Sequence, residues 1–486
     1  MASSESVGLA VIGAGPAGLT AAHVLSRRGA HGIVYEADGV VGGISKTVER
    51  DGYRFDLGGH RFFTRIGPIQ RLWEETLGDE FLLRPRLSRI FYRGRFFAYP
   101  LRAEDVIRRL GLIEVLRCAG SWLAVRLRPR REKPTTFEDW VTDRFGRRLY
   151  EVFFRTYTEK VWGIPGSEIE SEWAVQRIKN LSFREAFVSA LGLKRTHVTS
   201  LIEEFRYPRL GPGQMWEAFR ERVEASGIPV LVRHRVTKVE HRKGRIEAIE
   251  LETPLGTVRR SVSGVLSTMP LSELVLALDP VPPRRVVEAA ERLRYRDMIV
   301  VGLITSDPDP FPDNWIYVHD PGVSVGRVQN FGAWSASMTR PGATSLGAEY
   351  FCFENDELWR KPDSELVELA ASELASIGLV DPAHIVEGFP IRVRRAYPMY
   401  DRGYGEAVTC LRDYVASFTN LQTAGRNGLH RYNNQDHSMW TAMLATVNLL
   451  DGADHDVWAV GTESDYLERG LVSESALGSE LVDAVS

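Results

Sequence analysis

Residues 7–36 read VGLAVIGAGPAGLTAAHVLSRRGAHGIVYE, and this stretch decides the fold. Residues 7–12 are a short apolar run, which is typical of a buried parallel strand. Glycines in residues 13–18 then open a helical pattern that ends at Gly29, and a second apolar run ends at Glu36. Glycines at this spacing let the backbone approach a pyrophosphate at a helix start, and the acid accepts hydrogen bonds from ribose hydroxyls. We therefore predict a bound dinucleotide, with contacts from Gly13, Gly15, Pro16, Ala17, Gly18, Glu36 and Ala37.

The composition is that of an ordinary globular protein. The 486 residues include 61 basic and 64 acidic side chains, a formal charge of −3, which gives no support to nucleic-acid binding. Three scattered cysteines are too few for a disulfide framework or a thiolate metal site. The sequence has no signal-type segment and no apolar run of transmembrane length. We expect a cytoplasmic enzyme with a small-molecule substrate, without nucleic-acid partners, bound metal or stable membrane insertion.

Two segments after Glu36 indicate which dinucleotide is bound. Gly42-Gly43 stands six residues after Glu36, and residues 52–65 read GYRFDLGGHRFFTR. Both segments resemble FAD-binding flavoproteins of the broad amine oxidase superfamily. The resemblance implies FAD rather than NAD, and non-covalent binding, because no histidine or cysteine stands in a recognisable attachment motif. It adds the cofactor-binding residues Gly42, Gly43, Ile44, Ser45, Gly58, Gly59 and His60, with His60 as a candidate catalytic residue.

The rest of the chain divides by its residue patterns. Short alternating runs separated by turns at residues 243–244 and 254–256 predict a β-meander. We expect an α/β fold: a Rossmann-like FAD-binding domain with an inserted mixed α+β substrate domain and a helical region. The FAD-binding domain comprises residues 1–100, 226–295 and 411–452, the helical region 101–225, the substrate domain 296–410, and an acidic tail 453–486. In FAD proteins of this class, the strand after the long insertion would bring Val236 near the adenine.

Residues 101–134 form a basic segment, with nine Lys and Arg residues against four acids and apolar residues at helical spacing. Such a segment can touch a membrane surface or an anionic substrate. The more common arrangement packs the apolar stripe inward and leaves the basic face in solvent. We expect that second arrangement here.

Residues 421–450 carry a second strong motif. A short strand ends at Gly425-Arg426, and a helix opens between Asn434 and Ser438. A helix start at this point can direct amides and positive dipole character at the pyrimidine edge of the flavin. His430 and His437 have no partner ligands nearby, so we expect no metal site. The predicted cofactor-binding residues of this motif are Gly425, Arg426, Asn434, Gln435, His437, Ser438 and Met439.

With both ends read, the chain resembles the UDP-galactopyranose mutase-like flavoproteins, within the superfamily of protoporphyrinogen oxidase and amine oxidases. The similarity rests on GAGPAG, GGIS, DLGGHRFFT, YTEKVWG, GRVQNF, RRAYPMYDRGY and GRNGLHRY. It implies that Arg327 and Tyr432 contact a substrate diphosphate and that Tyr157 and Trp162 border the nucleotide pocket. Tyr397 and Tyr400 either line the same pocket or pack between domains. The implied reaction is covalent catalysis by reduced flavin: its N5 attacks the anomeric carbon, the nucleotide diphosphate leaves, and the flavin holds an opened sugar that recloses as the other ring size.

Departures from the mutase pattern leave the reaction open. Where the mutases carry a second diphosphate-binding arginine, this chain reads QRIKNLSF, so Arg177 matches the first arginine and Lys179 or Arg184 would have to replace the second. The acid after the mutase tyrosine falls on Asn434, unless Asp436 takes its place. Loss of one such cation removes ~1.5–3 kcal/mol of binding. We expect a mutase-like enzyme for an activated sugar, with NAD(P)H or another reductant for the flavin. The alternative is an FAD-dependent oxidoreductase that acts on a sugar or secondary metabolite.

Overall fold

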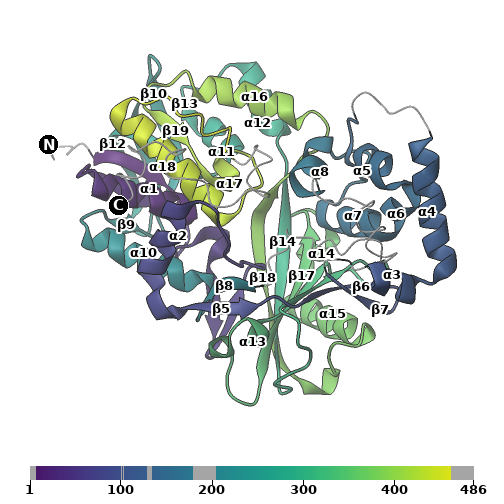
Figure 1. The fold of residues 1–486 in the computed structure, drawn as a ribbon. Coiled ribbons are helices and arrows are strands. Elements are labelled where there is room, and N and C mark those ends of the chain that lie inside the picture. Colours follow the sequence, from purple (N-terminus) through teal and green to yellow (C-terminus); the bar gives the residue numbers. More distant parts are fainter. Residues whose placement is uncertain (1–6, 100, 102, 128–133, 179–203, 461–486) are drawn as a thin grey trace.

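The computed structural model describes residues 7–99, 101, 103–127, 134–178 and 204–460 (Figure 1). Most of the predicted acidic tail, from residue 461 on, lies outside these residues, as do Lys179 and Arg184. Two large sheets with flanking helices make up the molecule, and a group of helices stands beside them. None of the described helices combines the length and the apolar character needed to cross a membrane.

The first sheet is built around β1 (Val7–Ile12), which lies between two parallel neighbours. β2 (Gly32–Tyr35) flanks it on one side and β12 (Gly256–Ser267), from the middle of the chain, on the other. The strand order is β13-β10-β11-β12-β1-β2-β9, and β19 also pairs with β12. The other strands are β9 (Val230–Leu231), β10 (Arg235–Arg242), β11 (Arg245–Thr253), β13 (Leu278–Asp279) and β19 (Leu421–Thr423). Antiparallel β10, β11 and β12 form the predicted meander.

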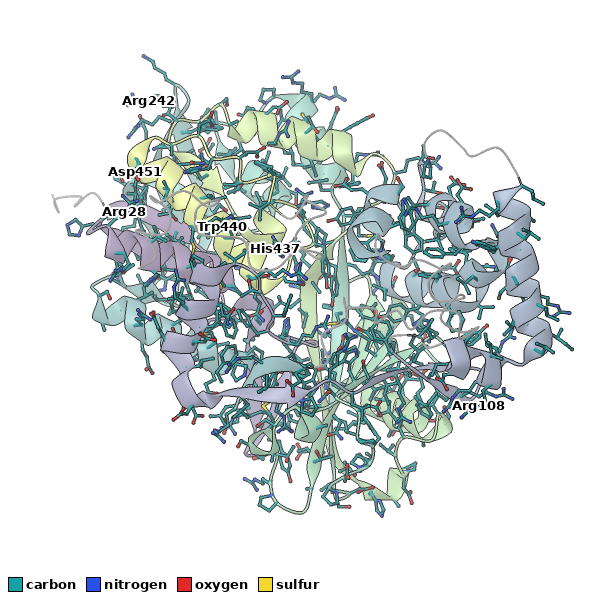
Figure 2. The ribbon with its side chains drawn as sticks, viewed as in Figure 1. Arg28, Arg108, Arg242, His437, Trp440 and Asp451 are labelled. Carbon is teal, nitrogen blue, oxygen red and sulfur yellow. The ribbon has the colours of Figure 1, made fainter. Side chains whose placement is uncertain are left out.

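Helices from both ends of the chain pack together beside this sheet. α1 (Pro16–Arg27) lies against α18 (Gln435–Asp451) and α10 (Pro212–Ala225), and their apolar side chains form one buried cluster. Arg28, directly after α1, forms a 3.3 Å salt bridge with Asp451, the last residue of α18 (Figure 2). The other helices of this part are α2 (Gly67–Leu77), α11 (Leu271–Leu276), α12 (Arg284–Arg292), α16 (Tyr404–Val415) and α17 (Gly425–Gly428). The predicted α/β fold class is confirmed.

The second sheet has the order β18-β14-β17-β16-β15-β6-β7 and is antiparallel except between β15 and β6. Its strands are β6 (Ser88–Tyr92), β7 (Arg95–Ala98), β14 (Tyr295–Thr305), β15 (Trp315–Val318), β16 (Arg327–Asn330), β17 (Thr344–Cys352) and β18 (Ile385–Pro398). Two small ladders pair β3 (Thr47–Arg50) with β4 (Tyr53–Asp56) and β5 (Phe81–Pro85) with β8 (Glu204–Pro208). Short helices α13 (Phe331–Trp334) and α14 (Glu357–Arg360) follow β16 and β17.

The two faces of this second sheet differ, because successive side chains of a strand point to opposite sides. One face is apolar, and α15 (Asp363–Ser376) covers it. On the other face, Trp315 pairs with Gln329, and Arg327 pairs with both Tyr317 and Glu349. Residues paired in register share a face of the sheet, so these polar and aromatic side chains lie together.

The predicted helical region contains several short helices around an aromatic core (Figure 1). They are α3 (Ala103–Leu110), α4 (Leu112–Arg126), α5 (Phe137–Phe145), α6 (Arg147–Leu149), a π-helical turn (Tyr150–Arg155), α7 (Thr156–Trp162) and α8 (Ser171–Ile178). α4 runs along the outer edge of this group.

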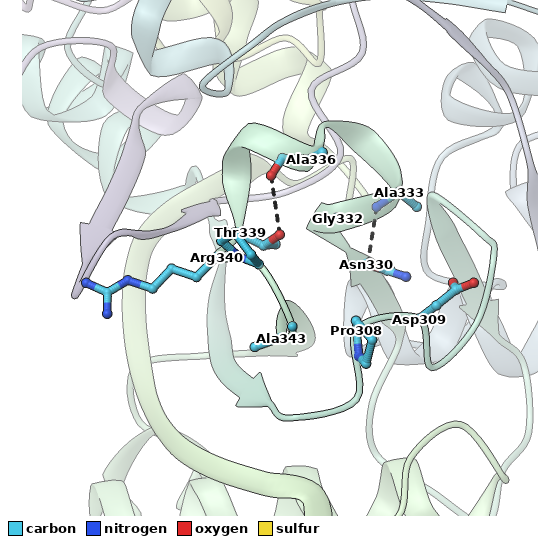
Figure 3. A pocket seen from close by; sticks show the side chains of 11 residues that line it. Pro308, Asp309, Asn330, Gly332, Ala333, Ala336, Thr339, Arg340 and Ala343 are labelled. Atoms are coloured by element: carbon cyan, nitrogen blue, oxygen red, sulfur yellow. Dashed lines mark hydrogen bonds between the residues drawn. The ribbon is translucent and has the colours of Figure 1, made fainter.

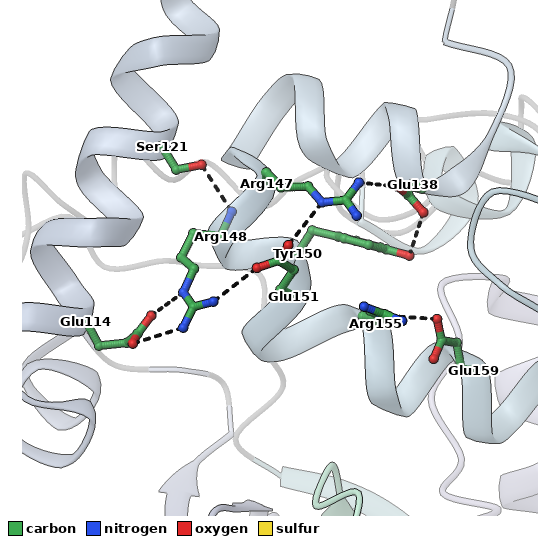
Figure 4. A network of polar contacts seen from close by, with 9 residues as sticks. All are labelled: Glu114, Ser121, Glu138, Arg147, Arg148, Tyr150, Glu151, Arg155 and Glu159. Atoms are coloured by element: carbon green, nitrogen blue, oxygen red, sulfur yellow. Dashed lines mark hydrogen bonds and ion pairs between the residues drawn. The ribbon is translucent and has the colours of Figure 1, made fainter.

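Only half of the arrangement expected for the basic segment is observed in α4: its arginines Arg117 and Arg126 face solvent, but several of its apolar side chains do so as well. Its buried contact is polar: Arg148 forms an ion pair with Glu114, and the Arg148 amide donates to Ser121 Oγ at 3.1 Å (Figure 4). The hydrogen bonds from Arg148 hold the pKa of Glu114 below its usual value. This ion pair and the buried Cys118 occupy the inward face, and the apolar side chains on the opposite side of α4, Leu116 and Leu123 among them, point to solvent.

Candidate active site

The turn after β1 leaves an open cradle at the start of α1. Gly13 has φ +97°, a left-handed conformation that favours glycine, and its amide donates to Tyr35 O at 2.8 Å. No described side chain caps the first amides of α1, so these donors stay available to an anion. A Cβ placed on Gly15 would lie 3.8 Å from Gly43 Cα, so the two glycine loops face each other. These residues fit a pyrophosphate.

Glu36 organises the adenosine side of this cradle. Its carboxylate accepts hydrogen bonds from Ala14 N at 2.7 Å and Asp38 N at 2.8 Å. The Gly42 amide donates to Ala14 O at 2.8 Å, which places the turn of Gly42 and the following short helix Gly43–Ser45 beside the first loop. Val236 is buried on β10, close to where His234 N donates to Glu36 O at 2.7 Å. The structure thus brings these predicted residues together.

The C-terminal motif packs onto the same helix start. A Cβ on Gly425 would lie only 2.9 Å from Ala17 Cβ, so glycine is required for this approach. The Gly425 amide donates to Thr441 Oγ1 of α18 at 3.0 Å, and α18 begins directly after Asn434, as predicted. The N-terminus of α18 therefore lies close to that of α1.

Two predicted residues of α18 direct their side chains into the protein. Gln435 Oε1 accepts from Trp216 Nε1 at 3.1 Å, and Met439 is buried with its sulfur 3.2 Å from Trp73 Nε1. Both side chains support the fold, so only their backbone is left to face a ligand. The nearby Ser438 hydroxyl donates to Asn433 Oδ1 at 2.7 Å. Within the described residues no cluster of His, Cys, Asp and Glu could hold a metal ion.

His60 lies at the junction of the two sheets. It follows Gly58, which has φ +125°, and its Nε2 is 3.3 Å from Leu57 O. Burial, together with the charges of Arg426 and Arg327, lowers the pKa of His60 to about 4. At neutral pH its imidazole is uncharged and can exchange hydrogen bonds without adding positive charge. The positive charge at this junction comes from Arg426. Its Nη2 donates to Asn433 O at 2.8 Å, and its guanidinium lies 4.5 Å from the Tyr432 ring centroid.

Arg327 is paired with a carboxylate that the sequence did not identify. The buried Glu349 accepts from Arg327 Nε at 2.8 Å and from Gln329 Nε2 at 2.7 Å. Arg327 Nη2 also donates to Tyr397 Oη at 2.7 Å. The positive charge of Arg327 is therefore neutralised inside the protein, and its fork orients the Tyr397 hydroxyl.

An aromatic wall stands beside this group. The rings of Tyr397 and Tyr432 stack with centroids 5.6 Å apart and planes 5° apart. Trp162 and Tyr400 lie behind them and are only 2% and 1% exposed. Tyr400 Oη accepts from the Tyr432 amide at 2.8 Å. This burial favours the packing alternative for Tyr400, and it places the Trp162 side chain behind the wall instead of at the border of a pocket.

Tyr157 forms the other side of the site. Its ring stacks on His319 at 4.6 Å and meets the edge of Tyr317 at 5.6 Å. In the same motif, Lys160 Nζ donates to the carbonyl oxygens of Val318, Asp320 and Val325 at 3.2, 2.6 and 3.1 Å, which fixes the connection from β15 to β16. The YTEKVWG motif thus places the ring of Tyr157 at the site and uses Lys160 to hold the β15–β16 connection in place.

Sequence reasoning missed Glu349, Gln329, Trp315 and Tyr317. The signal that could have revealed three of them is the alternation in WIYV (315–318) and RVQN (327–330), which places Trp315, Tyr317, Arg327 and Gln329 on one face. Glu349 stands inside an apolar strand and shows no such signal. The side chain of Arg177 is outside the described part of the chain.

A separate hollow lies at the other end of β16 (Figure 3). It is lined mainly by small residues around α13, together with Asp309 and Arg340. The described residues that line it include no predicted site residue, so we assign the chemistry to the junction at His60.

Comparison with known proteins defines the class of this fold and site. A family model described as flavin containing amine oxidoreductase matches residues 16–387. The chain belongs to this family, whose members are flavin-dependent, as the motifs predicted.

Several solved structures share the fold. Reduced UDP-galactopyranose mutase is 21% identical, with a TM-score of 0.83 over 96% of this chain and 100% of that chain. A putative protoporphyrinogen oxidase from Exiguobacterium sp. 255-15 is 18% identical, with a TM-score of 0.70 over 91% and 99%. An engineered putrescine oxidase is 16% identical, with a TM-score of 0.61 over 92% and 99%. The predicted resemblance to the mutase-like group of this superfamily is confirmed at the level of fold.

Proposed function

We propose that this protein binds FAD non-covalently and, with the flavin reduced, interconverts the ring forms of an activated sugar in the cytoplasm. The observation that carries the proposal is the convergence of Arg327, Tyr397 and Tyr432 beside a neutral His60, in a fold similar to reduced UDP-galactopyranose mutase. When bound, reduced FAD would supply an electron-rich centre, and NAD(P)H or another reductant would supply the electrons.

The residues of the chain have separate tasks in this proposal. The amides after Gly13 and at the start of α1 hold the cofactor pyrophosphate. The Tyr397 hydroxyl accepts a hydrogen bond from Arg327, so its own proton is left to donate to an oxygen of the substrate diphosphate. The aromatic wall of Tyr397 and Tyr432 orients the substrate and excludes water. His60, uncharged, exchanges a hydrogen bond at the junction without repelling a cation.

A second candidate function is net oxidation of the substrate. The pairing of Arg327 with Glu349 favours it, because a diphosphate would meet less net positive charge at Arg327 than the mutase-like reading requires. In that case FAD would accept hydride from a C–H bond of the substrate, and a second acceptor would reoxidise it.

Anaerobic absorbance at the flavin band separates the two functions. A panel of nucleotide sugars is added to the oxidised enzyme and then to the dithionite-reduced enzyme. We expect no bleaching of the oxidised form and isomerisation only in the reduced sample. Bleaching of the oxidised flavin by one substrate would instead establish an oxidoreductase. Tyr397→Phe should keep the flavin and lower the isomerisation rate about tenfold or more through the lost hydrogen bond. The control Tyr414→Phe, whose half-buried ring packs on Phe418 near the end of α16, should leave the rate unchanged.

A further inference from the structure

Two arginines and a tryptophan gather next to the proposed site. Arg61 directly follows His60, and Arg86 stands between β5 and β6. Their guanidinium carbons lie 5.6 Å and 5.5 Å from the ring centroid of the same residue, Trp315. Arg86 also lies over the ring of Tyr99, at 5.1 Å, and forms a side-chain hydrogen bond with Tyr99. Two separate loops thus bring positive charge to one aromatic platform.

The charge at this platform is not balanced. Within the described residues, neither Arg61 nor Arg86 forms an ion pair, whereas Arg327 is paired with Glu349. Arg61 Nη1, Arg86 Nε and Trp315 Nε1 are buried atoms without a hydrogen-bond acceptor in the described structure. The Trp315 side chain is only 5% exposed. Buried donors normally find partners, so this arrangement calls for an acceptor with several oxygen atoms.

The platform continues the face of the sheet that carries the proposed site. Trp315 is paired in register with Gln329, and Tyr317 with Arg327. The Tyr317 ring, two residues along the strand from Trp315, contacts Tyr157. A molecule that lies along this face can therefore touch Tyr157 and Arg327 with one end, and with the other the two arginines that form no ion pair within the described residues.

We propose that Arg61, Arg86 and Trp315 form a subsite for a phosphate group of the substrate. The assignment rests on the proposed function, which it deepens by moving the main anion contact away from Arg327. Two guanidinium groups and an indole N–H offer several donors and two positive charges to one anion, and a phosphate group supplies the several oxygen atoms and the negative charge that they require.

The test measures binding of inorganic pyrophosphate to the FAD-loaded enzyme by calorimetry, without any sugar. The loaded cofactor occupies the glycine cradle, so the probe reports on a second anion site. We expect Arg61→Gln/Arg86→Gln to raise the Kd at least about tenfold and Trp315→Phe to raise it a few-fold. Arg340→Gln is the matched control, because Arg340 also lies over an aromatic ring, that of Tyr53, but outside the site.

The outcomes separate this subsite from the proposed function. An unchanged Kd in the double variant, or no binding by the wild-type enzyme, would overturn the subsite, whatever the enzyme does to sugars. Failure of every sugar to isomerise would overturn the proposed function and leave the pyrophosphate result standing. The flavin spectrum and the melting temperature of each variant show that the fold is kept.

The exposed face of α4 carries a second, independent inference. Five apolar residues at helical spacing have large exposed fractions: Leu112 66%, Ile113 70%, Leu116 61%, Leu123 53% and Leu127 79%. Contiguous exposed apolar surface marks a contact with another partner. The inward face is already fixed by Glu114 and Arg148, so rotation of the helix cannot bury this stripe.

Positive charge surrounds the stripe. Arg117 and Arg126 are exposed on α4, and Arg108 is exposed on α3 (Figure 2). An apolar helix face with basic flanks fits the interface of an anionic bilayer, where apolar side chains enter the acyl boundary and cations meet lipid phosphates. A second copy of the chain would bring like charges together.

We infer that α4 rests on the surface of an anionic membrane. The full chain should sediment with vesicles of phosphatidylcholine and phosphatidylserine, less so at high salt. Leu116→Ser/Leu123→Ser should abolish this binding, and the matched control Leu255→Ser, at a distant turn, should keep it. If the wild type does not sediment with the vesicles, the inference is wrong. It is also wrong if Leu116→Ser/Leu123→Ser elutes as a smaller particle than the wild type in gel filtration while Leu255→Ser does not, since a second copy of the chain would then cover this face in the wild type.

Discussion

Gly15→Val should yield a folded protein that is purified without its flavin. A Cβ at position 15 meets only backbone atoms of Gly43, at 3.8 Å and 3.9 Å, which is ordinary van der Waals contact. The polypeptide therefore tolerates the change. The added side chain fills the space between the two glycine loops, through which the backbone would approach the pyrophosphate. The measurement is the ratio of flavin to protein absorbance, together with circular dichroism and the melting temperature.

Two other glycines serve as controls for this variant. Gly18→Ala should damage the fold itself, because its Cβ would lie 1.7 Å from the Gly13 carbonyl oxygen. Gly120→Ala should change neither fold nor flavin, because nothing lies within 4 Å of a Cβ at that position on α4. If Gly15→Val keeps a full complement of flavin, the pyrophosphate does not lie in this cradle.

Glu349→Ala should lower the free energy of unfolding by about 3 kcal/mol. The substitution removes the counter-charge of Arg327, whose side chain is only 18% exposed, and leaves a buried guanidinium unpaired. It also removes the acceptor of Gln329 Nε2, and Gln329 Oε1 has no other partner in the described structure. Urea denaturation followed by fluorescence measures the loss.

The origin of this loss is tested by removing both charges. Arg327→Met/Glu349→Leu should stay within about 1 kcal/mol of the wild type, because no buried ion is left without its partner. The control Glu357→Ala, at a side chain that is 92% exposed, should change the stability by less than about 0.5 kcal/mol. If the double variant loses as much stability as Glu349→Ala, or more, lost packing and not the unpaired charge is responsible.

The sequence predicted those parts of the molecule that depend on neighbouring residues. The turn between β1 and α1 and the start of α18 follow from local glycines, apolar runs and a capping position, so their bounds agree with expectation. The partner of Arg327 could not be predicted, because it depends on the register between β16 and β17, which a single sequence does not specify. The outward face of α4 follows from an ion pair between residues 34 positions apart, Glu114 and Arg148, which helical periodicity does not reveal.

β12 has a consequence for how the chain becomes an enzyme during synthesis. Its first half pairs with β11, close by in sequence, while its second half pairs with β1, where Val262 meets Val7. The pairing of β1 with β12 can therefore form only after some 255 further residues have been synthesised. The packing of α1 against α18 requires synthesis of nearly all of the described chain. The second sheet and the helical region can fold on the ribosome before the first sheet is complete. A chain cut before α18 would keep the glycine loops and most of the second sheet but would lack the helix that packs against α1, so we expect it to bind no cofactor.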